Sequence, residues 1–161
     1  RLSFFFIMIA FNLFAPCVFA KDLTHRIGVG YKSPFPIDVP GIAVQYYPYQ
    51  DIGFSGVLGI DTQKNNSKFG LMARGYRILY QEENMNFYMG GGAGLLTDEA
   101  AGVSESGVGV AAFVGGEFFL QGLENLGFSF EGGFDVASLK SGVRFRTFGA
   151  SPLTAGMIFY F

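Results

Sequence analysis

The sequence has 161 residues, a length typical of one domain, and only 15% of them are charged. Soluble domains average about 25% charged residues, whereas half of this sequence is hydrophobic and 17% is aromatic. This composition excludes a disordered chain. The net charge of −2 gives no basic surface for nucleic acid. We therefore expect a β-rich chain in contact with lipid, with no nucleic-acid partner.

The first twenty residues have the pattern of a secretory signal peptide. An apolar run at 4–14 is followed by a small-residue cleavage site that ends at Ala20. The run is shorter than the ~20 apolar residues of a membrane-spanning helix, although a retained anchor is an alternative. Cys17, the only cysteine, raises a lipoprotein as another alternative, but the proline before it fits a lipobox badly. We predict a signal peptide at 1–20 and one domain at 21–161.

The rest of the chain alternates apolar with small or polar residues, in stretches of about ten residues that turn residues separate. This pattern is typical of a transmembrane β-barrel. The predicted strands span 24–32, 41–48, 52–61, 68–80, 86–96, 107–120, 126–136 and 153–161. We therefore predict an all-β fold, an eight-stranded antiparallel up-and-down transmembrane β-barrel preceded by a signal peptide.

The predicted connections differ in length along the chain. Those after the second, fourth and sixth strands have three to five residues, whereas the others are mostly longer and more polar. The longer ones span 33–40, 62–67, 97–106 and 137–152. Outer-membrane barrels have short periplasmic turns and longer extracellular loops. The sequence therefore indicates a bacterial outer membrane, with both chain ends on the periplasmic side.

The cost of placing charge against lipid, about 2–4 kcal/mol at the bilayer midplane, predicts which side of each strand faces inward. Buried charges must be paired, so we expect a network of ion pairs in the barrel lumen. Its predicted members are Arg26, Lys32, Asp61, Arg74, Glu117, Glu131 and Asp135. Arg77 has the opposite parity from Arg74, so either a bulge separates them or Arg77 reaches outward to the lipid headgroups.

The C-terminal segment carries a resemblance to a known family. The chain ends Gly-Met-Ile-Phe-Tyr-Phe, with Met157, Phe159 and Phe161 at alternating positions. Together with eight strands behind a signal peptide, this resembles small outer-membrane barrels of the OmpA/OmpX type. The resemblance implies that the barrel-assembly machinery recognises these three residues. It also implies contact with outer-membrane lipid and lipopolysaccharide, and no segment resembles the peptidoglycan-binding domain of larger relatives.

No pattern in the sequence favours catalysis, a cofactor or a metal. His25 is the only histidine, and no nucleophile or acid can be placed beside it by spacing. Some barrels of this size modify lipid A with His and Ser at the extracellular rim, whereas His25 lies near the periplasmic one. The run Gly90–Gly94 lacks the Gly-Lys-Ser/Thr ending of a phosphate-binding loop. Asp98, Glu99 and Glu105 are better explained as a solvated acidic loop than as ligands of a hard cation.

The last long connection combines basic and aromatic residues. Lys140, Arg144, Phe145 and Arg146 are candidates for contact with the anionic sugars of lipopolysaccharide or with a surface partner. An alternative is that the flanking strands simply extend beyond the membrane. We expect a structural or surface-interaction protein, not an enzyme. A narrow channel and a secreted lipocalin-like barrel that binds an apolar ligand remain as alternatives.

Overall fold

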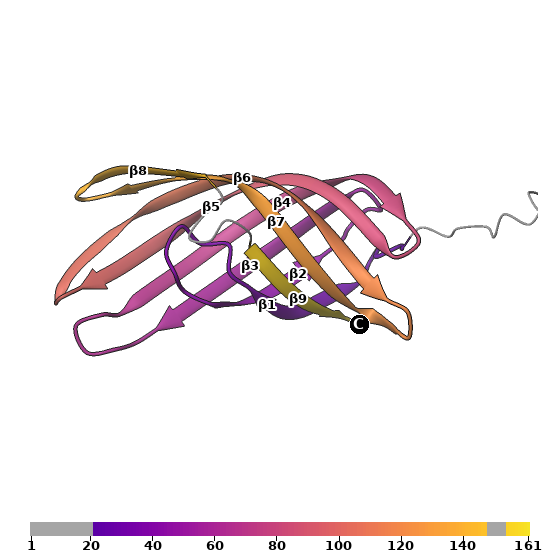
Figure 1. Ribbon diagram of the computed structural model, residues 1–161, viewed down its shortest axis with the longest axis horizontal. Helices are drawn as coiled ribbons and strands as arrows, with labels where there is room; N and C mark the ends of the chain where they lie inside the picture. Colours follow the sequence, from indigo (N-terminus) through magenta and orange to yellow (C-terminus); the bar gives the residue numbers. More distant parts are fainter. Residues whose placement is uncertain (1–20, 148–153) are drawn as a thin grey trace, which may run out of the picture.

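The computed structural model describes residues 21–147 and 154–161, which form a closed antiparallel β-barrel (Figure 1). The predicted signal peptide at 1–20 lies outside the described residues, as does 148–153. In the described part of the chain no helix is long and apolar enough to cross a membrane. The strands are β1 Ile27–Lys32, β2 Gly41–Tyr46, β3 Ile52–Asp61, β4 Lys68–Glu82, β5 Met85–Ala100, β6 Val103–Leu120, β7 Leu123–Leu139, β8 Gly142–Thr147 and β9 Thr154–Tyr160.

These nine labels correspond to eight positions around the barrel. Each strand from β1 to β7 pairs with the next along the chain, and β9 pairs with both β7 and β1 to close the sheet. Strand β8 pairs with the second half of β7, and β9 pairs with its first half. Together, β8 and β9 therefore take the eighth place. The predicted all-β, eight-stranded, up-and-down antiparallel barrel is confirmed.

The barrel has two unlike ends (Figure 1). At the terminal end lie the C-terminus and the turns that join β2 to β3, β4 to β5 and β6 to β7. At the loop end lie the connections after β1, β3, β5 and β7, where long hairpins project. Two connections at this end are much shorter than the sequence predicts. Strands β5 and β6 are joined by Ala101 and Gly102, whose φ angles of 53° and 81° suit a two-residue hairpin turn.

The second correction at the loop end concerns the predicted connection at 137–152. Strand β7 continues to Leu139, and β8 returns along it from Gly142, so most of the described part of this connection is strand. The structure thus matches the interpretation that the flanking strands extend. On β8, Val143 and Phe145 point outward and alternate with Arg144 and Arg146, as strand geometry requires.

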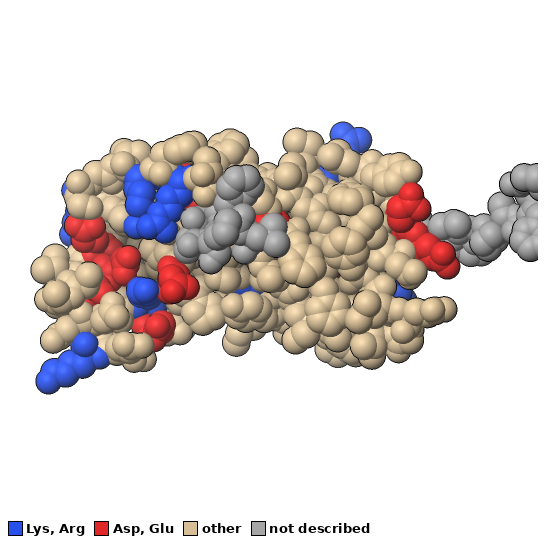
Figure 2. All heavy atoms as spheres, in the orientation of Figure 1, with Lys and Arg blue, Asp and Glu red and all other residues tan. Residues whose placement is uncertain are grey.

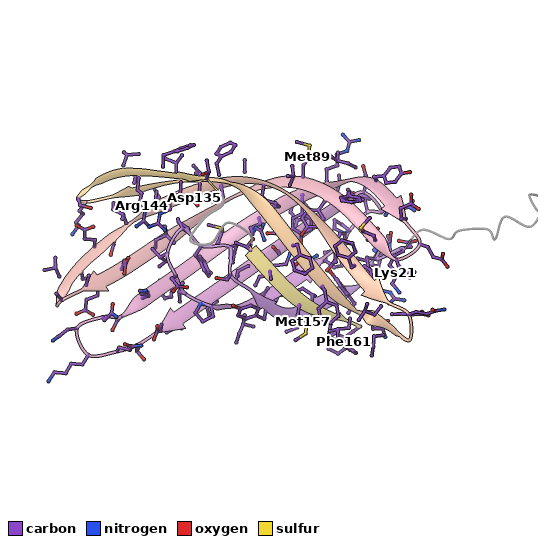
Figure 3. All side chains as sticks on the ribbon, in the orientation of Figure 1. Lys21, Met89, Asp135, Arg144, Met157 and Phe161 are labelled. Carbon is purple, nitrogen blue, oxygen red and sulfur yellow. The ribbon has the colours of Figure 1, made fainter. Side chains whose placement is uncertain are left out.

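Side chains divide between the two faces of the wall as strand geometry requires. Each strand carries large hydrophobic side chains that point outward. Among them are Ile42, Leu58 and Val114, which are 68%, 43% and 59% exposed. Figure 3 shows Met89 and Met157 pointing away from the barrel, whereas Asp135 and Arg144 lie on its inner side. Arg77 points outward and pairs with Asp51 at 3.5 Å. The bulge in β4 comes after it, between Ile78 and Tyr80.

Candidate functional site

The barrel interior contains an ion-pair cluster centred on Glu131 of β7. Lys32 Nζ lies 3.1 Å from Glu131 Oε1, and Arg74 Nη2 lies 2.6 Å from Oε2. The Tyr88 hydroxyl donates a further hydrogen bond of 2.6 Å to Oε1. All three charged side chains are at most 6% exposed. One buried carboxylate of β7 thus serves two buried cations, which come from β1 and β4.

Aromatic rings complete the surroundings of the two cations. The guanidinium carbon of Arg74 lies 3.8 Å from the centre of the Phe113 ring. Lys32 Nζ lies 5.6 Å and 5.8 Å from the ring centres of Tyr76 and Tyr88. Ring faces carry partial negative charge and attract cations most strongly where water is excluded. Two cations share one carboxylate, so one positive charge is not neutralised by an ion pair. The rings therefore compensate part of that charge.

A second polar cluster surrounds Glu117 of β6, nearer the terminal end. The Tyr160 hydroxyl donates to Glu117 Oε1 at 2.7 Å, and the Tyr47 hydroxyl donates to Oε2 at 3.3 Å. Gln45 Nε2 in turn donates to both tyrosine oxygens, at 2.7 Å and 2.8 Å. Glu117 is fully buried, and among the described residues no cation forms an ion pair with it. Hydroxyl groups therefore replace a counter-charge at this carboxyl group.

The other predicted lumen residues lie apart from these two clusters. Asp135 is 3% exposed and lies opposite Arg146 in the β7–β8 pair, toward the loop end. Arg26 precedes β1 and donates a hydrogen bond of 2.9 Å to Asn125 in an exposed position. Asp61 is half-buried at the end of β3, in register with Lys68. Of the seven predicted residues, the structure thus brings Lys32, Arg74 and Glu131 into direct contact.

The loop between β1 and β2 folds into the barrel and fills the loop-end half of its lumen. Phe35, Ile37 and Val39 are at most 2% exposed. We call residues 33–40 the plug. The connection spans 33–40 as predicted, but it is not one of the polar loops that the sequence predicts at this end, because its apolar side chains are buried against a wall with glycines at Gly41, Gly59 and Gly70.

Basic side chains fasten the plug to the wall. Arg144 and Arg146 donate to the carbonyl oxygen of Pro36 at 2.9 Å and 3.2 Å, and Lys68 donates to that of Asp38 at 3.2 Å. Both arginines are thus directed inward from β8, whereas Phe145 between them is 64% exposed and stacks on Phe134. Of the predicted loop contacts, only Phe145 and the exposed Lys140 of the hairpin turn are directed away from the lumen.

The residues before β1 cover the terminal end. Leu23 is 1% exposed, and the amide of His25 donates to the carbonyl of Tyr47 at 2.7 Å. The Thr24 hydroxyl and amide both donate to Asp22, which holds the pKa of that carboxyl group below its ordinary value. His25 itself is exposed and adopts a φ of 62°. This segment therefore closes the terminal mouth as the plug closes the other.

The predicted assembly residues lie on the outer surface beside the closing seam. Met157 and Phe159 of β9 are 45% and 44% exposed, and Phe161 is 74% exposed. The rings of Phe159 and Phe161 meet at 5.1 Å, and the Phe161 amide donates to the carbonyl of Ile27 at 2.9 Å. Figure 3 shows Met157 and Phe161 on the outside of the barrel.

Sequence reasoning did not identify the tyrosines that organise the interior. Tyr47, Tyr76, Tyr88 and Tyr160 are at most 4% exposed, and neighbouring rings lie 5.5–6.2 Å apart. Strand alternation was the available signal. Tyr76 is two residues from the inward Arg74 and so lies on the same face, and Tyr160 is next to the outward Phe159 and so lies on the opposite face. The partner of each hydroxyl depends on strand register, which a single sequence does not reveal.

The site has the chemistry of a packed polar interior. In the described part of the chain no group of three or more His, Cys, Asp or Glu residues is gathered to hold a metal ion. The two carboxylates accept hydrogen bonds from cations and hydroxyls, whereas Gln45 Oε1, Arg74 Nε and the Tyr76 hydroxyl have no hydrogen-bond partner among the described residues. Comparison of the chain with protein-family models, curated proteins and solved structures finds no match, so the resemblance to OmpA/OmpX barrels rests on architecture.

Proposed function

We propose that this protein is an outer-membrane β-barrel of a Gram-negative bacterium, of the OmpA/OmpX type. Its role is structural or surface-interacting, through the loop end, and the polar clusters fill its lumen. The observation that carries the proposal is the distribution of side chains. Apolar residues point outward along the wall, and the buried charges point inward. In Figure 2 the charged side chains gather toward the two ends, and the surface between them is mostly uncharged.

Lipid explains this distribution better than water does. An outward apolar face is costly in water and favourable in a bilayer, where barrel closure also satisfies every main-chain polar group of the wall. A secreted lipocalin-like barrel has the same closed strand topology but needs an apolar interior that is open to a ligand. The interior here holds ion pairs and a plug. The proposed partners are therefore outer-membrane lipid, lipopolysaccharide at the loop end, and the assembly machinery at Met157, Phe159 and Phe161.

Electrophoretic mobility tests the membrane proposal directly. We expect the chain refolded in detergent to migrate faster in SDS without boiling than after boiling, because a barrel closed in lipid-like surroundings resists SDS at room temperature. We also expect it in the outer-membrane fraction of the cells that make it. Unchanged mobility, together with a protein that stays soluble without detergent, would contradict the proposal and favour the lipocalin-like alternative.

Conductance separates a filled barrel from a narrow channel. Eight strands leave an interior just wide enough for side chains, and here both mouths are covered, by Leu23 and by the plug. We therefore expect no steady open state when the refolded protein is inserted into a planar bilayer in 1 M KCl. A stable ohmic conductance in proportion to inserted protein would show an open bore and contradict this prediction.

A further inference from the structure

The wall around the plug forms a largely apolar chamber. One ring of inward-facing residues runs in register through seven neighbouring strands without a polar side chain, and Arg144 of β8 continues it beside Ala137. Its members, from β1 to β7, are Gly30, Ala43, Val57, Met72, Gly94, Gly109 and Ala137. The polar clusters begin one ring nearer the terminal end, at Gln45, Ser55 and Arg74. This ring is thus apolar from β1 to β7, whereas polar side chains lie on both sides of it, with Lys32 one ring nearer the loop end and Gln45, Ser55 and Arg74 one ring nearer the terminal end.

Glycines shape this chamber to fit the side chains of the plug. A Cβ atom on Gly70, Gly59 or Gly41 would lie 2.7 Å, 2.8 Å or 3.1 Å from the Phe35 ring. Real Cβ contacts are almost never that close, so the ring occupies space that only glycine leaves free. A Cβ on Gly109 would lie 3.5 Å from Pro36, in ordinary contact. The chamber therefore accepts an aromatic ring followed by a compact apolar group.

The plug is held in the chamber without being part of the sheet. In the described part of the chain, its hydrogen bonds to the wall come from the side chains of Lys68, Arg144 and Arg146. Its remaining bonds are internal, such as that from the Ser33 hydroxyl to the carbonyl of Val39. Withdrawal of the plug would therefore break three side-chain bonds and no strand pair.

The loop end is recessed between its hairpins. A recess of about 430 Å³ lies between the hairpin tips and is lined by Asp98, Glu105 and Arg144 among others. Beneath the plug, Pro34 lines a cavity of about 40 Å³ together with Arg74 and Glu131, whose ion pairs close the lumen. An emptied chamber would thus have the ion pairs of Glu131 at its base and would open toward the loop end.

We propose that the plug is a releasable internal occupant and that the emptied chamber binds a small aromatic ligand. The ligand class follows from the Phe35 ring, which shows what the glycine-lined wall accepts. Arg144 and Arg146 act as the clamp that keeps the chamber closed. The proposal goes beyond the membrane role, because it depends on the interior of the barrel and not on what surrounds the wall.

A reversible lock tests the chamber. Pro36→Cys and Gly109→Cys, in a chain with Cys17→Ser, place two thiols close together, since a Cβ atom at position 109 would lie 3.5 Å from the Cγ atom of Pro36. With Arg144→Ala and Arg146→Ala added, we expect the reduced protein to bind indole, measured by saturation-transfer NMR in detergent. We expect at least tenfold weaker binding after oxidation, with micelle partitioning the same in both states. Equal binding in the two states, no binding in either, or failure of the disulfide to form would overturn the proposal.

A labelling experiment tests the clamp without the lock. A single cysteine at Ile37→Cys, also with Cys17→Ser, should react slowly with a water-soluble maleimide, and at least tenfold faster when Arg144→Ala and Arg146→Ala are added. Val143→Ala and Phe145→Ala are matched controls, because these side chains point outward from the same strand. They should leave the rate unchanged. If the arginine variant and the control label at the same rate, the arginines do not hold the plug and the proposal fails.

Discussion

Replacing Glu131 by glutamine should cost about 3–5 kcal/mol of unfolding free energy, the range for removing one partner of a buried ion pair. Gln keeps the size of the side chain but leaves Lys32 and Arg74 in the lumen without their shared carboxylate. Urea unfolding of the refolded barrel in lipid vesicles, followed by electrophoretic mobility, measures the change. The unfolding midpoint should move to markedly lower urea.

Two further variants show whether the loss comes from the ion pairs. Glu124→Gln removes a carboxylate of the same size from an exposed position on β7 and should change stability by less than about 0.5 kcal/mol. Adding Lys32→Met to Glu131→Gln removes one of the two uncompensated cations and should recover part of the loss. A Glu131→Gln barrel as stable as the natural one would mean that water or the tyrosine hydroxyls, not the carboxylate, stabilise the cations.

Gly30→Ala should destabilise the barrel at the pairing of β1 with β9, where the sheet closes. The Cβ of Gly30→Ala would lie 2.7 Å from the Cα atom of Ile158 and closer still to the carbonyl oxygen of Met157. Strands β1 and β9 must move apart to make room, and overpacking of this kind costs about 1–3 kcal/mol, occasionally more. The same urea titration should show the loss, with a smaller fraction of fast-migrating protein after refolding.

Gly56→Ala is the matched control for this prediction. Gly56 also lies in a strand, β3, but it points outward and an added Cβ meets nothing within 4 Å. We expect its stability to equal that of the natural protein or to rise slightly, since alanine restricts the unfolded chain more than glycine does. If both alanine variants lose the same stability, strand glycine itself and not the tight seam is the cause.

The strands in which apolar outward residues alternate with small or charged inward residues could be predicted from the sequence. Strand β3 spans 52–61 as predicted, because Phe54, Leu58 and Ile60 alternate with small residues over its full length. The inward direction of Arg74 and Glu131 follows from the same alternation. The extensions of β5 to β8 at the loop end were not predicted, because small and polar residues interrupt the apolar alternation there; on β8 the outward pair Val143 and Phe145 was the available signal.

For the lumen, the sequence predicts which kinds of residue point inward but not which of them are in contact. Parity places charged residues inside, but the contact between Lys32 and Glu131 joins strands at opposite ends of the chain and depends on how the sheet is staggered. The plug escaped prediction for a different reason. Its prolines mark a loop, and a loop normally runs over the surface. Only the glycine-lined wall, assembled from several strands, makes the interior a better place for Phe35.

The seam between β1 and β9 also sets an order of events. Strand β9 pairs with β1 on one side and with β7 on the other, as in the match of Gly28 with Tyr160. The pairs among β1 to β8 join neighbours along the chain and can form locally, whereas both pairings of β9 must wait for the last segment. Pairing between residues so distant in sequence is slow, and until it forms, β1 and β7 present unpaired edges that can join other chains. We therefore expect closure of this seam to limit the rate of folding, and competing aggregation to begin at the edges that it leaves open.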